Sequence, residues 1–130
     1  MSGYLLDNTA LVDFSKGVEP VRSRILRLLT QGERLGVTPV TVTEFHSGTL
    51  LGQDPDWDRF MRGLEYWSIS FNAAVRAGYF RYVWLRHGVQ LSVPDALLAA
   101  VAEERDAILL TDDLRGFPMA EVRTERLRTP

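Results

Sequence analysis

The sequence predicts an α/β fold in which a central, mostly parallel sheet lies between two layers of helices. Short apolar segments with strand character alternate with helical segments along the chain, an order typical of parallel sheets. Residues 107–110 (Ala-Ile-Leu-Leu) are apolar without alternation, as expected of a parallel strand covered on both faces. The chain has 130 residues, which is enough for one domain with a real core and short for two. We therefore expect residues 1–130 to form a single domain with three layers, α/β/α.

Composition excludes several classes of protein. The chain has no cysteine, which excludes a disulfide framework, a thiolate metal site and a cysteine nucleophile. No apolar segment reaches the length of a membrane span, and the N-terminus lacks the basic flank and apolar core of a signal peptide, so we expect a cytoplasmic protein. The net charge is −2, which does not attract nucleic acid to the whole surface. Any contact with phosphate groups must therefore be local.

The first expected strand covers residues 3–6, and Asp7 follows it directly. Asn8 or Thr9 can cap a short helix over residues 10–16. A second helix is expected to begin at Pro20 and to end near residues 32–36.

The next segment is expected to contain a weaker strand and two helices. Pro39 weakens the strand over residues 37–40, because proline cannot donate a hydrogen bond to a neighbouring strand. Thr41 and Glu44 match a capping box that opens a helix reaching residues 50–51. After a loop over residues 52–55, helical spacing of apolar residues runs from Asp56 to Leu64.

A long helix follows a possible strand over residues 66–69. Ser70 is placed to cap this helix, which ends at residues 87–88. Its inward side is expected to consist of the apolar residues Ala73, Ala77, Phe80 and Trp84.

The best-defined part of the sequence is a helix that leads into a buried strand. Pro94 is expected to be the first helical residue, since it disfavours helical dihedral angles at Val93. Residues 96–102 have almost no polar side, so the helix should be largely buried. The strand over residues 107–110 follows it, and a last short strand is expected around Val122.

Five acidic residues occupy positions that such a sheet brings together. Asp7, Asp112 and Asp113 each follow a strand, and Asp95 lies at the start of the buried helix. The carboxyl ends of parallel strands share one edge of the sheet, where open α/β folds place their ligands. Glu44 joins this edge if the second strand runs parallel to the first.

Each acid also has a structural explanation of its own. Asp95 lies in the first turn of a helix, where the helix dipole favours a carboxylate by ~0.3–1 kcal/mol. Glu44 fits a capping box, and Asp7 can end a strand or cap a helix. Asp112 and Asp113 can form a polar turn.

Taken together, these acids favour a cation site. Converging carboxylates repel one another, and their pKa values rise unless a cation neutralises them. A cluster of oxygen ligands selects Mg²⁺ or Mn²⁺ over zinc. Such a site can activate water and stabilise the charge of an attack on phosphorus. Thr9 and Thr111 add hydroxyl groups that can orient a ligand or a carboxylate.

Other chemistries have less support in the sequence. His46 and His87 are far apart and lack the spacing of a zinc-binding helix. The phosphate-binding patterns GxxxxGK[ST] and GxGxxG are absent, and so is the GxSxG pattern of serine hydrolases.

Three segments together resemble the PIN domains, and among them the small VapC-type toxins of bacterial toxin–antitoxin pairs. YLLDNTALV is similar to the family's opening strand with its first metal-binding aspartate, here Asp7, followed two residues later by Thr9. VTVTEFHSG is similar to the segment with the family's glutamate, here Glu44. PDALLAAVAEERDAILLTDDLRGFP supplies the third acid and the strand with its T-x-D ending. Its matching residues are Asp95, Thr111, Asp113 and Phe117.

Two positions depart from the family pattern. Asp112 stands where Arg or Asn is frequent, so either Asp112 or Asp113 can be the fourth acid, and the spacing favours Asp113. Asp106 stands where a glycine is often found before the last core strand.

The resemblance implies a PIN-like fold and a Mg²⁺- or Mn²⁺-dependent endoribonuclease that acts as a toxin. It further implies a homodimer, an RNA substrate and inhibition by a cognate antitoxin protein. In this hypothesis Asp7 and Asp95 hold the ion, and Asp113 completes its shell directly or through water. Glu44 orients or activates the water. Arg115 is a candidate for a phosphate contact, against the alternative of a solvated loop residue.

Two other classes of function remain open at this level. One is a non-catalytic PIN-like binding or assembly module whose acids hold a structural ion or none. The other is a phosphoacceptor domain resembling response regulators, which has its acid pair after the first strand and a lysine late in the chain. Here the acid pair comes late and the only lysine is Lys16, which argues against that class.

Overall fold

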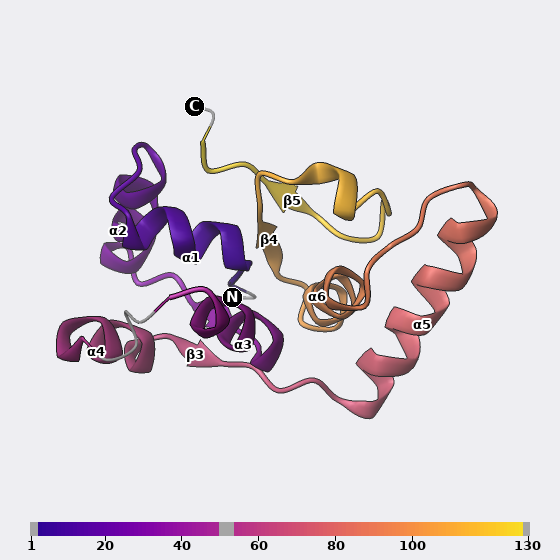
Figure 1. The fold of residues 1–130 in the computed structure, drawn as a ribbon, viewed down its shortest axis with the longest axis horizontal. Coiled ribbons are helices and arrows are strands. Elements are labelled where there is room, and N and C mark those ends of the chain that lie inside the picture. Colours follow the sequence, from indigo (N-terminus) through magenta and orange to yellow (C-terminus); the bar gives the residue numbers. More distant parts are fainter. Residues whose placement is uncertain (1–2, 50–53, 129–130) are drawn as a thin grey trace.

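Strand β1 (Tyr4–Leu6) lies at the centre of the sheet, with a parallel neighbour on each side. The computed structural model in Figure 1 describes residues 3–49 and 54–128. Tyr4 is in register with Leu35 on one side and with Ile108 on the other. All strands are parallel, in the order β3-β2-β1-β4-β5. The other strands are β2 (Leu35–Val37), β3 (Glu65–Tyr66), β4 (Ile108–Leu110) and β5 (Thr124–Glu125).

The helices form a layer on each face of this sheet (Figure 1). They are α1 (Asn8–Ser15), α2 (Val21–Thr30), α3 (Pro39–Ser47), α4 (Pro55–Gly63), α5 (Phe71–Arg86), α6 (Val93–Glu104) and the short 3₁₀ helix η2 (Leu114–Gly116). Side chains alternate between the two faces of a strand, and both faces are apolar here. Leu5 and Leu109 belong to the core under α5 and α6. Leu6 and Leu110 belong to the core under α1 to α4.

The α/β/α fold with a parallel sheet is therefore confirmed, and so are most of the expected elements. Helix α6 buries six residues between Ala96 and Ala102, as its apolar composition predicted. Ser70 caps α5 by accepting a hydrogen bond from the amide of Ala73 at 3.0 Å. Ala73, Ala77 and Phe80 lie buried on the inner side of α5, and Trp84 packs against the same core.

The prediction was wrong around Pro39. The strand covers Leu35–Val37 instead of the predicted residues 37–40, and Pro39 lies in the first turn of α3. Thr38, which is fully buried, caps this helix, so Thr41 and Glu44 do not form a capping box. Proline suits the first turn of a helix, because the backbone N–H that it lacks would have no hydrogen-bond acceptor within the helix at that position. Helix α3 ends at Ser47, before the predicted end at residues 50–51, and these residues and part of the loop over 52–55 lie outside the described residues.

Smaller corrections concern the ends of elements. Asp7, rather than Asn8 or Thr9, caps α1. Helix α6 begins at Val93, one residue before Pro94, because Ser92 caps it. The last strand is Thr124–Glu125 and not Val122, which belongs to the core. The strand expected over residues 66–69 is reduced to Glu65–Tyr66.

Candidate active site

Four acidic residues from four different elements line one small pocket at the carboxyl edge of the sheet. Asp7 follows β1, Glu44 lies on α3, Asp95 lies in the first turn of α6, and Asp113 precedes η2. The cavity has a volume of about 130 Å³, and none of the described residues that line it is basic. The remaining lining residues are Asn8, Thr9, Leu98 and Phe117. Strands β1 and β2 are parallel, which is the condition under which Glu44 was expected to join the aspartates.

Asp7 is the most buried of these acids, with 6% of its surface exposed. Its Oδ1 accepts hydrogen bonds from the Thr9 hydroxyl and from the Ala10 amide, both at 2.8 Å. Burial raises the pKa of the Asp7 carboxyl, and the hydrogen bonds from Thr111, Ala10 and Thr9 oppose this shift. Asp7 therefore has two roles, since it caps α1 and also presents a carboxylate to the pocket.

Thr111 connects two of the acids. It is almost completely buried at the end of β4, and its hydroxyl interacts with the Asp7 carboxyl. The same hydroxyl oxygen accepts a hydrogen bond from the Asp113 amide at 3.1 Å. Thr111 therefore fixes the backbone of Asp113 relative to the Asp7 side chain.

Glu44 and Asp95 are coupled to their neighbours through charge. Partial burial makes the largest contribution to the raised pKa of the Glu44 carboxyl, and the nearby charges of Asp95 and Asp7 raise the pKa further. Burial also raises the pKa of Asp95; Asp113 adds to this effect, while the hydrogen bond with Ser92 opposes it. The site thus holds several carboxylates that resist simultaneous ionisation in the absence of a cation.

Thr41 joins the helix that bears Glu44 to the strand that precedes Asp7. Its hydroxyl donates to the carbonyl oxygen of Leu6 at 3.4 Å, and its side chain is fully buried. The Thr38 cap on the same helix holds the first turn of α3. These two buried threonines set where Glu44 stands along the edge of the sheet.

The structure places Asp112 and Asp113 differently. Asp113 lines the pocket, whereas the Asp112 carboxylate accepts a hydrogen bond from the backbone amide of Arg128 at 3.1 Å. Arg115 is exposed, with its Nε 4.0 Å from Asp113 Oδ1. Arg128 itself forms two hydrogen bonds of 2.8 Å with Asp13 on α1.

The donor set suits a hard divalent cation. All the candidate ligands are oxygens, and the buried Asn8 Oδ1, which lines the pocket, has no hydrogen-bond partner among the described residues. Within residues 3–49 and 54–128, no group of three acidic or histidine side chains is already arranged to hold an ion. The oxygen chemistry of the lining residues fits Mg²⁺ or Mn²⁺.

Sequence reasoning missed two features of this site. Asn8 was considered only as a helix cap, although its place beside Asp7 was a usable signal. Gly116 lies directly against the Asp95 carboxylate. No pattern in the sequence indicated that contact, because it joins residues from η2 and α6.

Comparisons with known proteins agree with this fold. Solved structures with the same fold include VapBC from Salmonella typhimurium bound to DNA (TM-score 0.80, 24% identity, 98% of this chain and 99% of that chain). VapBC2 from Rickettsia felis bound to a promoter DNA fragment is similar (TM-score 0.80, 21% identity, 95% and 97% coverage). VapBC-1 from nontypeable Haemophilus influenzae is similar too (TM-score 0.81, 15% identity, 97% and 98% coverage).

At these levels of identity, the structural matches establish the fold. A comparison with curated proteins found no significant match. No helix in the described part of the chain is long and apolar enough to cross a membrane. The family model for the PIN domain matches residues 4–122, which include all four pocket acids, and the chain therefore belongs to the PIN-domain family.

Proposed function

We propose that this protein is a metal-dependent endoribonuclease that acts as the toxin of a toxin–antitoxin pair. The observation that carries the proposal is the convergence of Asp7, Glu44, Asp95 and Asp113 on one pocket within a PIN domain. Family membership supports a nuclease, and the acidic pocket supports the use of a divalent cation.

The pocket residues divide into ligands and supporting groups. Asp7 and Asp95 would hold Mg²⁺ or Mn²⁺, with Asp113 completing the shell directly or through water. The ion would supply a Lewis acid that polarises the phosphoryl group and lowers the pKa of bound water. Thr9 and Thr111 keep Asp7 oriented through their hydroxyl groups. Asn8 Oδ1 offers a neutral acceptor in the same pocket.

Glu44 is proposed to orient and deprotonate the attacking water. Its raised pKa brings the carboxyl nearer to the pH at which a general base works well. Arg115, at the rim beside Asp113, is proposed to contact a phosphate of the RNA.

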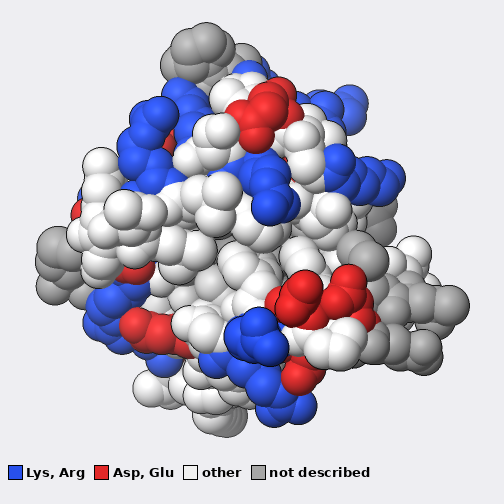
Figure 2. Space-filling view, turned by 90° about the vertical axis from the view of Figure 1, so that its left-hand side faces the viewer, with Lys and Arg blue, Asp and Glu red and all other residues white. Residues whose placement is uncertain are grey.

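A protein partner is proposed to silence the pocket. Several similar structures are of two-component complexes, among them FitAB bound to a DNA fragment and the VapBC assemblies. Figure 2 shows the face that carries α2 and α4, where acidic and basic side chains are interspersed. A groove on α1, α2 and α4 is lined by Leu26, Phe60 and the edge of the buried Phe14, together with the charged Arg22 and Asp56. An antitoxin helix with an apolar side and flanking charges fits this groove.

An arginine from the same antitoxin is proposed to reach the acidic pocket. A guanidinium group among the carboxylates would take the place of the cation. Replacing that arginine should weaken inhibition more than replacing a residue at the rim of the groove. Inhibition that is insensitive to every basic residue of the partner would contradict this mode.

The test of the function is cleavage of labelled single-stranded RNA by the purified protein. We expect cleavage with Mg²⁺ or Mn²⁺, none with a chelator, and none with the Asp7→Asn variant prepared in the same way. Calorimetric titration with Mn²⁺ separates the alternatives. Binding of the ion without cleavage of any RNA would instead support the non-catalytic module.

A further inference from the structure

Asp113 is the pocket acid that has the least support from an element of its own. Asp7 caps α1, Glu44 lies within α3, and Asp95 lies in the first turn of α6. Asp113 instead precedes the short 3₁₀ helix η2, which has no side-chain cap among the described residues. Contacts with neighbouring residues must therefore set the place of the Asp113 carboxylate.

Two hydrogen bonds hold the turn that contains Asp112 and Asp113. The Asp113 amide donates to the Thr111 hydroxyl oxygen at 3.1 Å, a contact within the turn itself. The Asp112 carboxylate accepts a hydrogen bond, also of 3.1 Å, from the amide of Arg128, 16 residues later. Arg128 belongs to the C-terminal segment of residues 126–128, which follows the parallel strand β5 and so begins at the same edge of the sheet as the acids. The turn is thus tied to a distant part of the chain.

The C-terminal segment is itself attached to the helices beside it. It runs from β5 toward the side of the molecule that carries α1 and α2 (Figure 1). Leu127 is buried in the core under α1 to α4. Arg24 on α2 donates from Nη1 to the carbonyl oxygens of Arg126 at 2.8 Å and Leu127 at 3.2 Å. These contacts fix the backbone that leads to Arg128.

An ion pair with a buried carboxylate anchors Arg128 to α1. Nε and Nη2 of Arg128 each donate a hydrogen bond of 2.8 Å to a different oxygen of Asp13. Such a two-point contact fixes the orientation of the guanidinium group as well as its distance. Asp13 is buried, whereas 57% of the Arg128 side chain is exposed. Asp13 does not line the pocket but lies on the helix that Asp7 caps, so the pair links the C-terminal segment to that helix.

The Asp112 carboxylate lies close enough to the pocket to influence it. Burial makes the largest contribution to the raised pKa of Asp7, and the charge of Asp112 also raises this pKa. Without the Arg128 amide, Asp112 would be a second carboxylate in the same turn, free to compete with Asp113 for a cation. Holding Asp112 in place therefore matters for the acid beside it.

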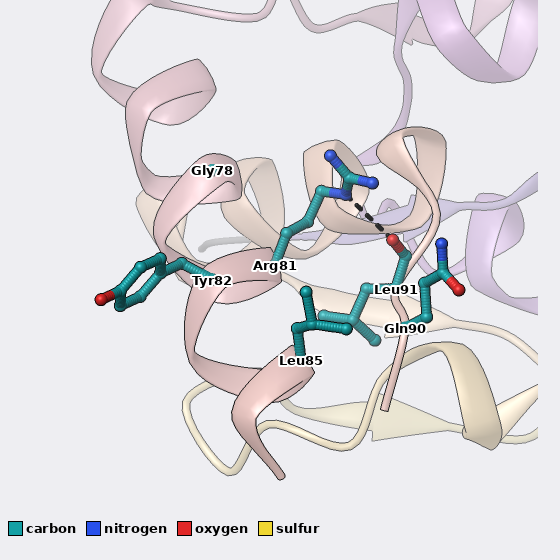
Figure 3. A pocket seen from close by; sticks show the side chains of 6 residues that line it. All are labelled: Gly78, Arg81, Tyr82, Leu85, Gln90 and Leu91. Carbon is teal, nitrogen blue, oxygen red and sulfur yellow. Dashed lines mark hydrogen bonds between the residues drawn. The ribbon is translucent and has the colours of Figure 1, made fainter. Parts of the chain in front are cut away.

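The segment before Asp95 has a comparable contact with a different consequence. Figure 3 shows Arg81 on α5 beside a cavity of about 240 Å³, where its Nε donates a hydrogen bond of 2.9 Å to the Leu91 carbonyl oxygen. Asp95, however, lies in a helix of 12 residues that Ser92 caps. That helix fixes the backbone of Asp95 without help from Arg81, whereas Asp113 has no such support.

We propose that Arg128 is a positioning residue for Asp113. Anchored on Asp13, Arg128 holds the Asp112 carboxylate at its own backbone amide, and the turn then presents Asp113 to the pocket. In this role Arg128 touches neither the ion nor the RNA and acts only through Asp112. The inference rests on the proposed function, in which Asp113 completes the shell of the cation.

The first test needs neither metal nor RNA. Amide hydrogen exchange followed by NMR should be about tenfold faster at Asp113 in Arg128→Gln than in wild type, because the turn opens more readily. Exchange at the Asp95 amide should not change, since this amide donates to the Ser92 hydroxyl oxygen at 3.1 Å within its own helix.

Arg123→Gln is the matched control for Arg128→Gln. The side chain of Arg123 is exposed to the same extent as that of Arg128, and it also pairs with an aspartate, Asp106. Asp106 precedes β4 and therefore lies at the opposite edge of the sheet from the pocket. The control makes the same change of charge and should leave the exchange at Asp113 unchanged.

The second test is the affinity for Mn²⁺, measured by calorimetric titration. We expect Arg128→Gln to raise the dissociation constant roughly 3–10-fold, less than the 10–100-fold typical of a group bonded directly to a metal ligand. Asp112→Ala should have the same effect because it removes the acceptor for the Arg128 amide, while Asp112→Asn should keep the wild-type affinity because its oxygen can still accept. Arg128→Gln should add nothing to Asp112→Ala, since both changes break the same contact.

A double variant separates positioning from a role in stability alone. Arg128→Gln leaves the buried Asp13 carboxylate without this partner and should lower the melting temperature. Asp13→Asn combined with Arg128→Gln removes both charges, so its melting temperature should lie closer to that of wild type. Because the double variant also lacks the anchor, its affinity for Mn²⁺ should remain as low as that of Arg128→Gln.

Two results would overturn the proposal. One is exchange at Asp113 that is unchanged in Arg128→Gln and in the double variant. The other is an affinity for Mn²⁺ that returns to the wild-type value in the double variant, or that falls further when Arg128→Gln is added to Asp112→Ala. A wild-type protein that binds no Mn²⁺ would contradict the proposed metal site instead, and exchange at Asp113 would still show whether Arg128 holds the turn.

Discussion

The backbone of Gly116 lies against the carboxylate of Asp95. A Cβ atom at position 116 would stand 2.5 Å from Asp95 Oδ2, closer than such atoms approach, and 3.1 Å from Asp95 Cγ. The loop after β4 therefore helps to hold the Asp95 side chain in the pocket. This contact joins η2 to the first turn of α6, and it is possible because residue 116 has no side chain.

Gly116→Ala should impair the site without unfolding the protein. The added methyl group must displace the Asp95 carboxylate or the η2 loop, and we expect RNA cleavage to fall about 10–100-fold, as for other changes beside a metal ligand. The stabilisation by saturating Mn²⁺ in thermal melts should also shrink. Gly48→Ala is the control, since its Cβ would come no nearer than 3.9 Å to another atom. Equal activity of both variants would show that Asp95 tolerates the displacement.

Asp7→Asn and Asp95→Asn should each abolish metal-dependent cleavage. Losing one anionic ligand removes several kcal/mol of stabilisation by the cation, which corresponds to a rate loss of about two orders of magnitude or more. The fold should persist in both, because asparagine is as good an N-cap as aspartate at position 7. Circular dichroism checks the fold, and Asp56→Asn on exposed α4 is a control with the same change of charge. Unchanged cleavage in either pocket variant, from a nuclease-free preparation, would remove that residue from the site.

The two neighbouring acids after β4 should respond differently to the same change. Asp113→Asn should lose cleavage to a similar extent as Asp95→Asn, because Asp113 lines the pocket. Asp112→Asn should retain most of the activity, since the Asp112 carboxylate binds the amide of Arg128, a bond that an asparagine oxygen can also accept. Initial rates at saturating metal compare the two variants. The reverse order of activities would make Asp112 the fourth acid.

Glu44→Gln should stabilise the protein at neutral pH in the absence of metal. The folded-state pKa of Glu44 lies above its unfolded value, so its contribution to stability is present below the unfolded pKa and is lost as the pH rises through the folded pKa. Glutamine does not ionise, so the variant does not lose this stability as the pH rises. The free energy of unfolding of the variant should therefore exceed that of wild type at pH 7.5 and become equal to it near pH 4. Because Glu44 is exposed to solvent, we expect a difference of a few tenths of a kcal/mol.

Thermal melts in chelator and in millimolar Mn²⁺ measure this difference. Mn²⁺ should reduce or reverse the difference in stability between Glu44→Gln and wild type, because an ion that binds only the folded state stabilises wild type more. Thr38→Ala is the contrasting control. It removes the true cap of α3 and should cost about 1 kcal/mol at every pH, with or without metal. A Glu44→Gln variant equal to wild type in both buffers would mean that Glu44 does not share the charge of the pocket.

The sequence by itself determined the class of fold and the edge at which the acids gather. Residues 107–110 are apolar on both sides, and a strand of that kind must be covered on both faces, which requires a parallel sheet between helices. Once the strands are parallel, Asp7 and Asp113 come to the same edge, because Asp7 directly follows β1 and Asp113 lies three residues after the end of β4. Local chemistry also located the cap at Ser70, since a side-chain oxygen before an apolar helix has few other roles.

Only the tertiary structure decided what depends on contacts between distant segments. Pro39 was assigned to a strand and Thr41 to the cap of the following helix. A proline after two β-branched residues is locally compatible with either a strand end or a helix start. Leu35 and Val37 are buried in the core on one face of β2, and Gly36 lies against Trp67 on the other, so the strand occupies residues 35–37 and Pro39 falls in the helix. The different positions of the Asp112 and Asp113 side chains depend on the backbone of Arg128, 16 residues after Asp112, whose amide binds the Asp112 carboxylate. The outer side of α5 could be recognised as uncovered only when its inner side was seen against α6, since both sides are apolar in the sequence.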